Sequence, residues 1–233
     1  MKNKTIKNFG DYLDKVEVVA AEDKIMALYR GQSEEKTLLP SIARDKPSRD
    51  TTSIEVEMLN ELKRRAQTLL VRELKDKWDW LVFAQHYGMK TRLLDWTSNP
   101  LAALWFACSN EYKIHQDSFV YIFLANKTML LDKSKDTSPF HQGKTKILRP
   151  PQNNDRIIAQ SGWFTAHKFS KSLNSFVGLE KNKSYKERII KLLIPADEKP
   201  DILKKLDKFG VNNQTIFPDF EGVCKQLNWE YEK

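Results

Sequence analysis

Cysteine and histidine are scarce in this sequence of 233 residues. Its two cysteines, Cys108 and Cys224, form no CxxC pair, so the sequence offers neither a disulfide framework nor a structural zinc site. The four histidines lack HxxxH and HExxH spacing, which leaves a metal-centred mechanism without visible ligands. No stretch approaches the roughly 18 apolar residues of a membrane span, and residues 1–15 contain no continuous apolar export signal. These absences favour a cytoplasmic protein.

The residues that are present indicate a basic, globular chain. Lysine and arginine number 39 against 31 acidic residues, which gives a formal charge of +8. Hydrophobic residues make up 40% and aromatic residues 11%, too much core-forming material for a disordered chain. This length is enough to bury a sizeable core without disulfides, and no linker convincingly divides the chain. We therefore expect a single domain.

The hydrophobic pattern predicts both strands and helices along the chain. Apolar and β-branched runs predict strands at residues 27–29, 119–124 and 189–195, the first ending at Arg30. Helical periodicity predicts helices at residues 54–70, 78–88, 101–108 and 197–209. Residues 131–155, rich in polar residues and proline, read as a long surface connection.

Several motifs then occur in a fixed order along the chain. They are Tyr29-Arg30-Gly31-Gln32, Gln85-His86-Tyr87-Gly88, Thr91 to Pro100 (TRLLDWTSNP), Gln160-Ser161-Gly162-Trp163-Phe164 and Phe217 to Gly222 (FPDFEG). In these blocks the chain resembles the bacterial FRG-domain family, named for its (Phe/Tyr)-Arg-Gly motif. The resemblance implies an FRG domain over residues 25–227, preceded by a helical lead-in at 1–24 and followed by a tail at 228–233.

The chain also resembles, less specifically, the ADP-ribosyltransferase fold of the Arg-Ser-Glu type. This resemblance implies a single α/β (α+β) domain with a split, mixed β-sheet and surrounding helices. Arg30 would supply its first-strand arginine, Thr97-Ser98 its Ser/Thr motif before a helix, and Asp219 or Glu221 its late acid. This resemblance implies an NAD-dependent ADP-ribosyltransferase that acts as a toxin or phage-defence effector, with an antitoxin protein as a further partner. It implies Arg30, Glu221 and Asp219 as catalytic residues and no metal. The cofactor-binding residues would be Arg30, Gly31, Gln32, His86, Tyr87, Asp95, Thr97 and Ser98.

The chemistry of these side chains fits such a role. A guanidinium such as that of Arg30 makes bidentate bonds to phosphate, and Gly31 would let a ligand approach the backbone. Glu221 would place negative charge beside the ribose carbon that becomes cationic when nicotinamide leaves. The alternative function is a non-catalytic nucleotide- or phosphate-binding module, or a nuclease or other hydrolase.

Structural roles for the same residues remain open. Arg30 could form a buried ion pair with Asp95, and Asp219 and Glu221 could only cap a helix. His86, near a helix C-terminus that favours its cationic form, could be a packing or capping residue.

Basic clusters suggest an anionic acceptor. They lie at 63–65, 144–149, 168–171 and 181–188. They could form a surface that attracts phosphate, although a solvated face is the commoner outcome. We expect the acceptor to be nucleic acid, RNA before DNA, or else a protein.

Overall fold

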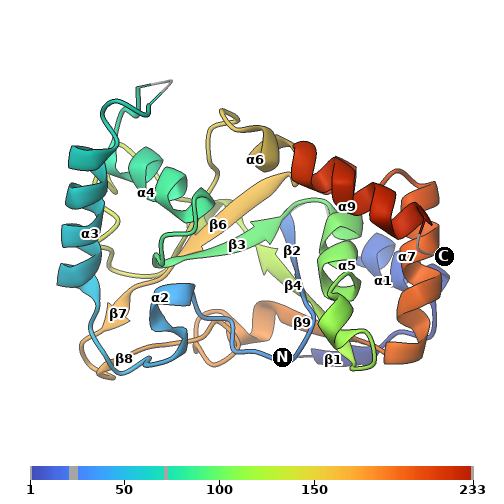
Figure 1. Ribbon diagram of the computed structural model, residues 1–233. Coiled ribbons are helices and arrows are strands. Elements are labelled where there is room, and N and C mark those ends of the chain that lie inside the picture. The colour runs from blue at the N-terminus through green and yellow to red at the C-terminus, as the bar shows by residue number, and fades with distance from the viewer. Residues whose placement is uncertain (1, 21–25, 71–72, 232–233) are drawn as a thin grey trace.

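A computed structural model describes residues 2–20, 26–70 and 73–231, in which a seven-stranded mixed sheet has the order β1-β9-β4-β2-β3-β6-β5 (Figure 1). Neighbouring strands are antiparallel except for β1 and β9, which are parallel. The strands of this sheet are β1 (Lys2–Thr5), β2 (Met26–Gln32), β3 (Leu93–Thr97), β4 (Ser118–Ala125), β5 (Lys146–Leu148), β6 (Gly162–Ala166) and β9 (Ile189–Ile194). A separate ribbon pairs β7 (Phe169–Ser170) with β8 (Ser175–Phe176). The predicted α/β class with a mixed sheet and surrounding helices is confirmed.

Helices flank the sheet in two groups (Figure 1). One group is α2 (Ser41–Arg44), α3 (Thr52–Arg65) and α4 (Lys77–His86), and the other is α1 (Phe9–Ala20), α5 (Pro100–Cys108), α7 (Lys199–Lys208) and α9 (Phe220–Tyr231). Two short helices, α6 (Asp155–Ala159) and α8 (Asn213–Ile216), lie in the connections, and 3-10 turns occur at Glu111–Lys113, Lys127–Met129, Lys186–Arg188 and Ala196–Glu198. Within the described residues, no helix is long and apolar enough to cross a membrane.

The central strand β4 is buried on both faces because its alternate side chains enter different cores. Val120 and Ile122 pack with α1, α5 and α7, whereas Phe119, Tyr121 and Phe123 pack on the opposite face. This explains why the segment reads as a continuous apolar run instead of an alternating one. A third core joins α3 and α4 to β3, β5 and β6.

Gly31 is explained by close packing of α5 on β2. A Cβ atom at this position would lie 2.0 Å from the Ala103 carbonyl oxygen and 2.6 Å from the Ala107 nitrogen. The space on the Cβ side of Gly31 is therefore occupied by helix backbone, which gives this glycine a packing role, while a ligand beside it stays a prediction. The strand also continues through Gly31 to Gln32, which places Arg30 inside β2 and not at its end.

The sheet is split between β2 and β3. These strands share a single register pair, Tyr29 with Thr97, whereas β2 and β4 pair over seven positions. Beyond that pair the guanidinium of Arg30, and not a backbone amide, bonds to the carbonyl of Asp95. The separation leaves room between the strands for a pocket.

The ends of the chain depart from the sequence-based description. Residues 1–24, expected as a helical lead-in, contribute the strand β1 as well as α1, which ends at Ala20; residues 21–25 lie outside the described part. Ile6 and Tyr12 of this segment are buried in the same core as α5. Helix α9 runs to Tyr231 and so includes most of the expected tail at 228–233.

Candidate functional site

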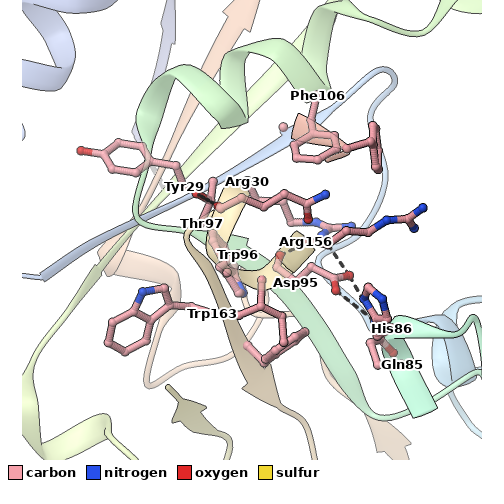
Figure 2. A pocket seen from close by; sticks show the side chains of 16 residues that line it. Tyr29, Arg30, Gln85, His86, Asp95, Trp96, Thr97, Phe106, Arg156 and Trp163 are labelled. Carbon is pink, nitrogen blue, oxygen red and sulfur yellow. Dashed lines mark hydrogen bonds and ion pairs between the residues drawn. The ribbon is translucent and has the colours of Figure 1, made fainter. Parts of the chain in front are cut away.

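A pocket of about 350 Å³ opens where β2 and β3 separate (Figure 2). Its walls come from β2, β3, β6, the end of α4, helix α6 and the turn before α9. The lining residues are Tyr29, Arg30, Gly31, Gln85, His86, Asp95, Trp96, Thr97, Phe106, Arg156, Ile157, Gln160, Gly162, Trp163, Phe164 and Phe217. A volume of this size is typical of small-molecule sites.

Arg30 extends from β2 into this pocket. Its Nη1 donates to the backbone oxygen of Asp95 at 2.8 Å, and the same nitrogen lies 3.7 Å from the Asp95 carboxylate. The buried Nε atom has no hydrogen-bond partner within the described part of the chain. Burial lowers the pKa of Arg30, opposed by the charge of Asp95, yet a guanidinium stays protonated at neutral pH. Arg30 therefore places a partly exposed cation at the pocket, while its Nε is covered by neighbouring atoms.

Asp95 supplies the carboxylate of the pocket, and its side chain is 57% exposed. The sequence-based expectation of a buried ion pair between Arg30 and Asp95 is therefore wrong, because the Asp95 carboxylate is exposed. The distance between the two charged groups is also long for an ion pair. Gln85 Nε2 donates to both carboxylate oxygens at 3.2 Å (Figure 2). The Gln85 amide is oriented in turn by Thr91, whose hydroxyl donates to Oε1 at 2.6 Å. This chain of bonds fixes the direction of the Asp95 carboxylate.

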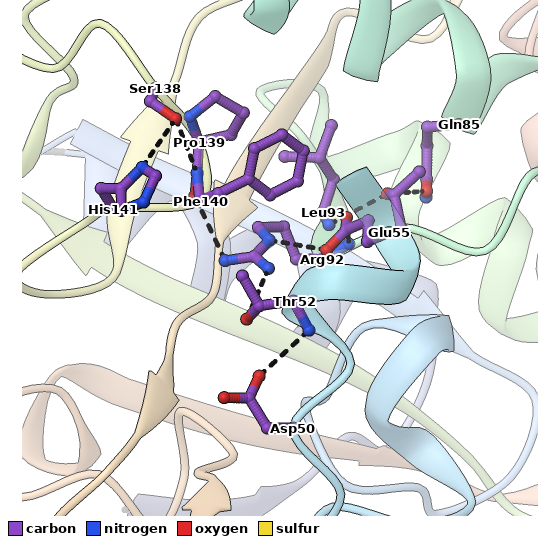
Figure 3. Close-up of polar contacts among 11 residues, drawn as sticks. Asp50, Thr52, Glu55, Gln85, Arg92, Leu93, Ser138, Pro139, Phe140 and His141 are labelled. Carbon is purple, nitrogen blue, oxygen red and sulfur yellow. Dashed lines mark hydrogen bonds and ion pairs between the residues drawn. The ribbon is translucent and has the colours of Figure 1, made fainter. Parts of the chain in front are cut away.

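A buried ion pair anchors the start of β3 (Figure 3). Glu55 of α3 accepts from the backbone nitrogen and from Nε of Arg92, both at 2.7 Å, and neither side chain is more than 1% exposed. Arg92 also donates to the Pro139 oxygen and the Thr52 hydroxyl. Burial raises the pKa of Glu55 against the opposing charge of Arg92. The pair ties α3 to the segment that carries Thr91 and Asp95.

Arg156 of α6 forms the opposite wall of the pocket. Its Nη2 and Nε donate to Asp219 at 2.6 and 3.2 Å, and its guanidinium lies 5.2 Å from the Phe217 ring centre. These bonds lower the pKa of Asp219, which is therefore ionised at neutral pH. Asp219 also accepts from the Gly222 nitrogen at 2.9 Å, so the capping role considered from the sequence is present at the start of α9.

His86 ends α4 where the pocket meets a second hollow of about 330 Å³, which contains Tyr87 and Asp219 and shares Arg156 with the pocket. Its Nε2 lies 3.0 Å from Nδ2 of Asn154. Burial and the nearby charge of Arg156 lower the pKa of His86. The expectation that the helix C-terminus favours a cationic His86 is wrong, because desolvation and a neighbouring guanidinium oppose it.

The structure brings together some of the predicted site residues and separates others. Arg30, Gly31, His86, Asp95 and Thr97 line the pocket. Five other predicted residues, Gln32, Tyr87, Ser98, Asp219 and Glu221, are not among its lining residues.

The predicted site residues that do not line the pocket make contacts elsewhere in the structure. Gln32 is buried and accepts from the Lys36 nitrogen, and Ser98 lies 3.5 Å from the Ser161 oxygen. Tyr87 and Asp219 face the second hollow. Glu221 accepts from Lys225 at 2.7 Å, one turn along α9, and its side chain is 65% exposed. Its catalytic role stays a prediction from the sequence.

Sequence reasoning missed several residues of the pocket. Gln85 belongs to the motif Gln85-His86-Tyr87-Gly88 but was not assigned a role, and Arg156 follows the segment read as a surface connection. Phe106, Gln160 and Phe217 also line the pocket. The motif blocks themselves are the available signal, since Gln85, Gln160 and Phe217 each begin one.

The comparisons with known proteins agree with one part of this picture. A family model of the FRG domain matches residues 26–116, which include β2, α4, β3 and α5. The match supports the resemblance to the FRG-domain family that the motifs within this segment predicted. No curated protein and no solved structure matches the chain.

Proposed function

We propose that this pocket binds NAD and that the chain is an NAD-dependent ADP-ribosyltransferase. The proposal depends chiefly on Arg30, a guanidinium that lines the pocket with 16% of its side chain exposed. Its ion pair with the Asp95 carboxylate is long at 3.7 Å, so an anionic ligand in the pocket would compensate this charge further. The pyrophosphate of a dinucleotide offers the oxygens that a guanidinium prefers.

The remaining lining fits the other parts of such a ligand. The Nε and Nη2 atoms of Arg156 already donate to Asp219, so Nη1 is the donor that Arg156 would offer to a phosphate. The rings of Phe106, Trp163 and Phe217 line the same pocket and provide apolar faces for a flat heterocycle. Thr97 is held in place by donating to the Gln160 oxygen at 2.6 Å.

Bound NAD would supply an activated bond between its nicotinamide nitrogen and the ribose carbon. In transfer, that bond would break with its electron pair going to nicotinamide, while a nucleophile of the acceptor would bond to the ribose carbon and release its proton to water. Asp95, held by Gln85, is the carboxylate placed to stabilise positive charge that develops in the pocket. We therefore assign Asp95 the role that the sequence pattern gave to Glu221 or Asp219.

A second candidate is a binding module without turnover. The observation that favours it is that both oxygens of Asp95 already accept from Gln85 while Arg30 lies 3.7 Å away. A carboxylate whose negative charge is already partly neutralised by such neighbours stabilises a developing cation less than a carboxylate without them. The same lining would then recognise a nucleotide or a phosphorylated partner.

The acceptor that we propose is nucleic acid, RNA before DNA. Tyr87 is 69% exposed beside the second hollow, where an unpaired base could stack on its ring. A protein acceptor, and an antitoxin that covers the pocket, are the other partners consistent with a toxin or defence effector.

The test uses purified protein and NAD labelled in its adenylate part, with total RNA, DNA or lysate as acceptor. We expect Arg30→Lys to weaken NAD binding at least tenfold, because an ammonium cannot reproduce the planar donor set. Asp95→Asn should keep binding but lose transfer, and Arg64→Lys on exposed α3 is the matched control.

Each outcome decides between the candidates. Binding without label transfer supports the module, and absence of NAD binding overturns the proposal. Loss of transfer in Glu221→Gln, with Asp95→Asn active, would restore the assignment made from the sequence. Poor growth on expression that Arg30→Ala relieves would support the toxin role.

A further inference from the structure

The side-chain amide of Asn154 has a fixed orientation. Asn154 is the N-cap of α6, and its Oδ1 accepts from the backbone nitrogens of Arg156 at 2.9 Å and Ile157 at 3.4 Å. Rotating the amide by half a turn would direct its NH₂ group at those two N–H groups and lose both bonds. The Nδ2 atom therefore faces away from the helix, toward His86.

This orientation determines which nitrogen of His86 carries the proton. Nδ2 of Asn154 is a donor only, and it lies 3.0 Å from Nε2 of His86, so Nε2 must be the acceptor. A neutral imidazole whose Nε2 accepts holds its hydrogen on Nδ1. Protonating Nε2 would set two donors against each other and break the bond.

Groups of both charges surround His86, and burial of the ring, which is the larger cause, acts with one of them to lower its pKa. That group is the guanidinium of Arg156. The other titratable groups that share a hollow with His86 are Tyr29, Arg30, Asp79, Tyr87, Asp95, Asp155 and Asp219. Asp95 and Asp219 are each already bonded to a neighbour, Gln85 and Arg156 respectively.

We propose that His86 is a hydrogen-bond donor of the pocket that is neutral at pH 7, with its tautomer set by Asn154, and that its Nδ1–H binds an unprotonated oxygen of the ligand. The oxygen is a phosphoryl or carboxamide oxygen, both of which accept and neither of which donates. The identity of the ligand oxygen rests on the proposed NAD-binding function, whereas the protonation state of His86 does not. His86 is consequently a specificity residue and not the base that removes a proton from an acceptor.

The first experiment measures the protonation state in the protein without ligand. Nitrogen-15 NMR of the histidine ring should show the Nδ1–H tautomer at pH 7 and a pKa of His86 below the ordinary histidine value. Asn154→Asp keeps an oxygen for the helix cap but turns a carboxylate oxygen toward Nε2. That variant should move the proton to Nε2 and raise the pKa of His86.

A matched control separates this effect from loss of a cap. Asn126 caps the 3-10 turn at Lys127–Met129 through the Thr128 nitrogen, and it does not line the hollows that contain His86. Asn126→Asp should leave the His86 signals unchanged. An Nε2–H tautomer in the unmodified protein, or an ordinary histidine titration, would overturn the inference whether or not NAD binds.

The second experiment measures ligand recognition with NAD as the probe. Asn in place of His86 keeps an N–H near the Nδ1 position, whereas Gln places its amide near the Nε2 position. We expect His86→Gln to weaken NAD binding at least tenfold and His86→Asn to recover a substantial part of that loss. Equal losses in the two variants would refute the donor role, while absence of binding in the unmodified protein would refute the nucleotide function and leave the NMR result intact.

Discussion

The buried pair of Arg92 and Glu55 gives the most direct quantitative prediction. Arg92→Met removes the cation and leaves the Glu55 carboxylate with only the backbone nitrogen of residue 92 as a partner. Both side chains are at most 1% exposed, so water cannot replace the lost guanidinium. Breaking one partner of a buried pair costs about 3–5 kcal/mol. For a chain of this size that corresponds to a fall in Tm of about 6–20 °C.

A double variant isolates the contribution of the charge. Glu55→Gln combined with Arg92→Met removes both charges but keeps an oxygen that accepts from the backbone nitrogen of residue 92. Replacing a buried ion pair by neutral groups is often close to neutral, so we expect most of the loss to be recovered. Glu55→Gln alone should be destabilising, because it leaves Arg92 buried without its counter-ion.

Equilibrium unfolding in urea measures the free energies of the two single variants and the double variant. Agreement requires a positive coupling, with the double variant more stable than Arg92→Met alone. A loss below about 1 kcal/mol in Arg92→Met, or simple additivity of the two changes, would refute the reasoning. The result bears on the pocket, since Arg92 sits between Thr91, which orients Gln85, and β3, which carries Asp95.

The elements that the sequence predicted well are those that bury most of their surface. The run at 119–124 and the helix at 101–108 became β4 and α5, which meet in one core. Segments this apolar have few stable positions other than a buried strand or a buried helix. The strands β1 and β5 were missed for the opposite reason, because β1 is a fully exposed edge strand and β5 has only three residues within a polar segment.

The end of the helix predicted at 54–70 shows a limit of periodicity. Ala66 and Leu69 continue the apolar spacing, but α3 stops at Arg65 and Leu69 is 78% exposed. The spacing of apolar residues identifies which side chains would share one face of the helix. How many of them are buried depends on how much of that face packs against α4. Tertiary contacts therefore set this boundary.

The pocket was only partly predictable because its members come from separate elements. Arg30 ends a predicted strand, and its pairing with Asp95 was among the roles that the sequence left open, so their proximity could be anticipated. Arg156 reaches the pocket from α6, a helix of five residues whose position depends on β6 and on the Asn154 cap. Glu221 is excluded from the lining by helix geometry, since it stands one turn before Lys225 on the exposed side of α9. Nothing in the local sequence separates that outcome from a catalytic one.

Three further predictions test packing, the basic surface and pH dependence. Gly31→Ala should destabilise the protein by about 3 kcal/mol or more in urea unfolding, because the new Cβ meets α5 backbone, whereas Gly143→Ala, with no atom within 4 Å, should be nearly neutral. Lys168→Glu with Lys171→Glu should flatten the salt dependence of RNA binding in a filter assay and leave NAD binding unchanged; an unaltered slope would place the RNA elsewhere. Burial, with the charges of Arg30 and Arg92, lowers the pKa of His167 to about 3, so folding favours its neutral form. The unfolded chain takes up this proton near pH 6.5, and stability should therefore fall by about 2 kcal/mol between pH 7 and pH 5 and continue to fall toward pH 3. His167→Asn should remove that part of the slope in unfolding curves measured across this range, and an unchanged slope would mean that His167 does not control it.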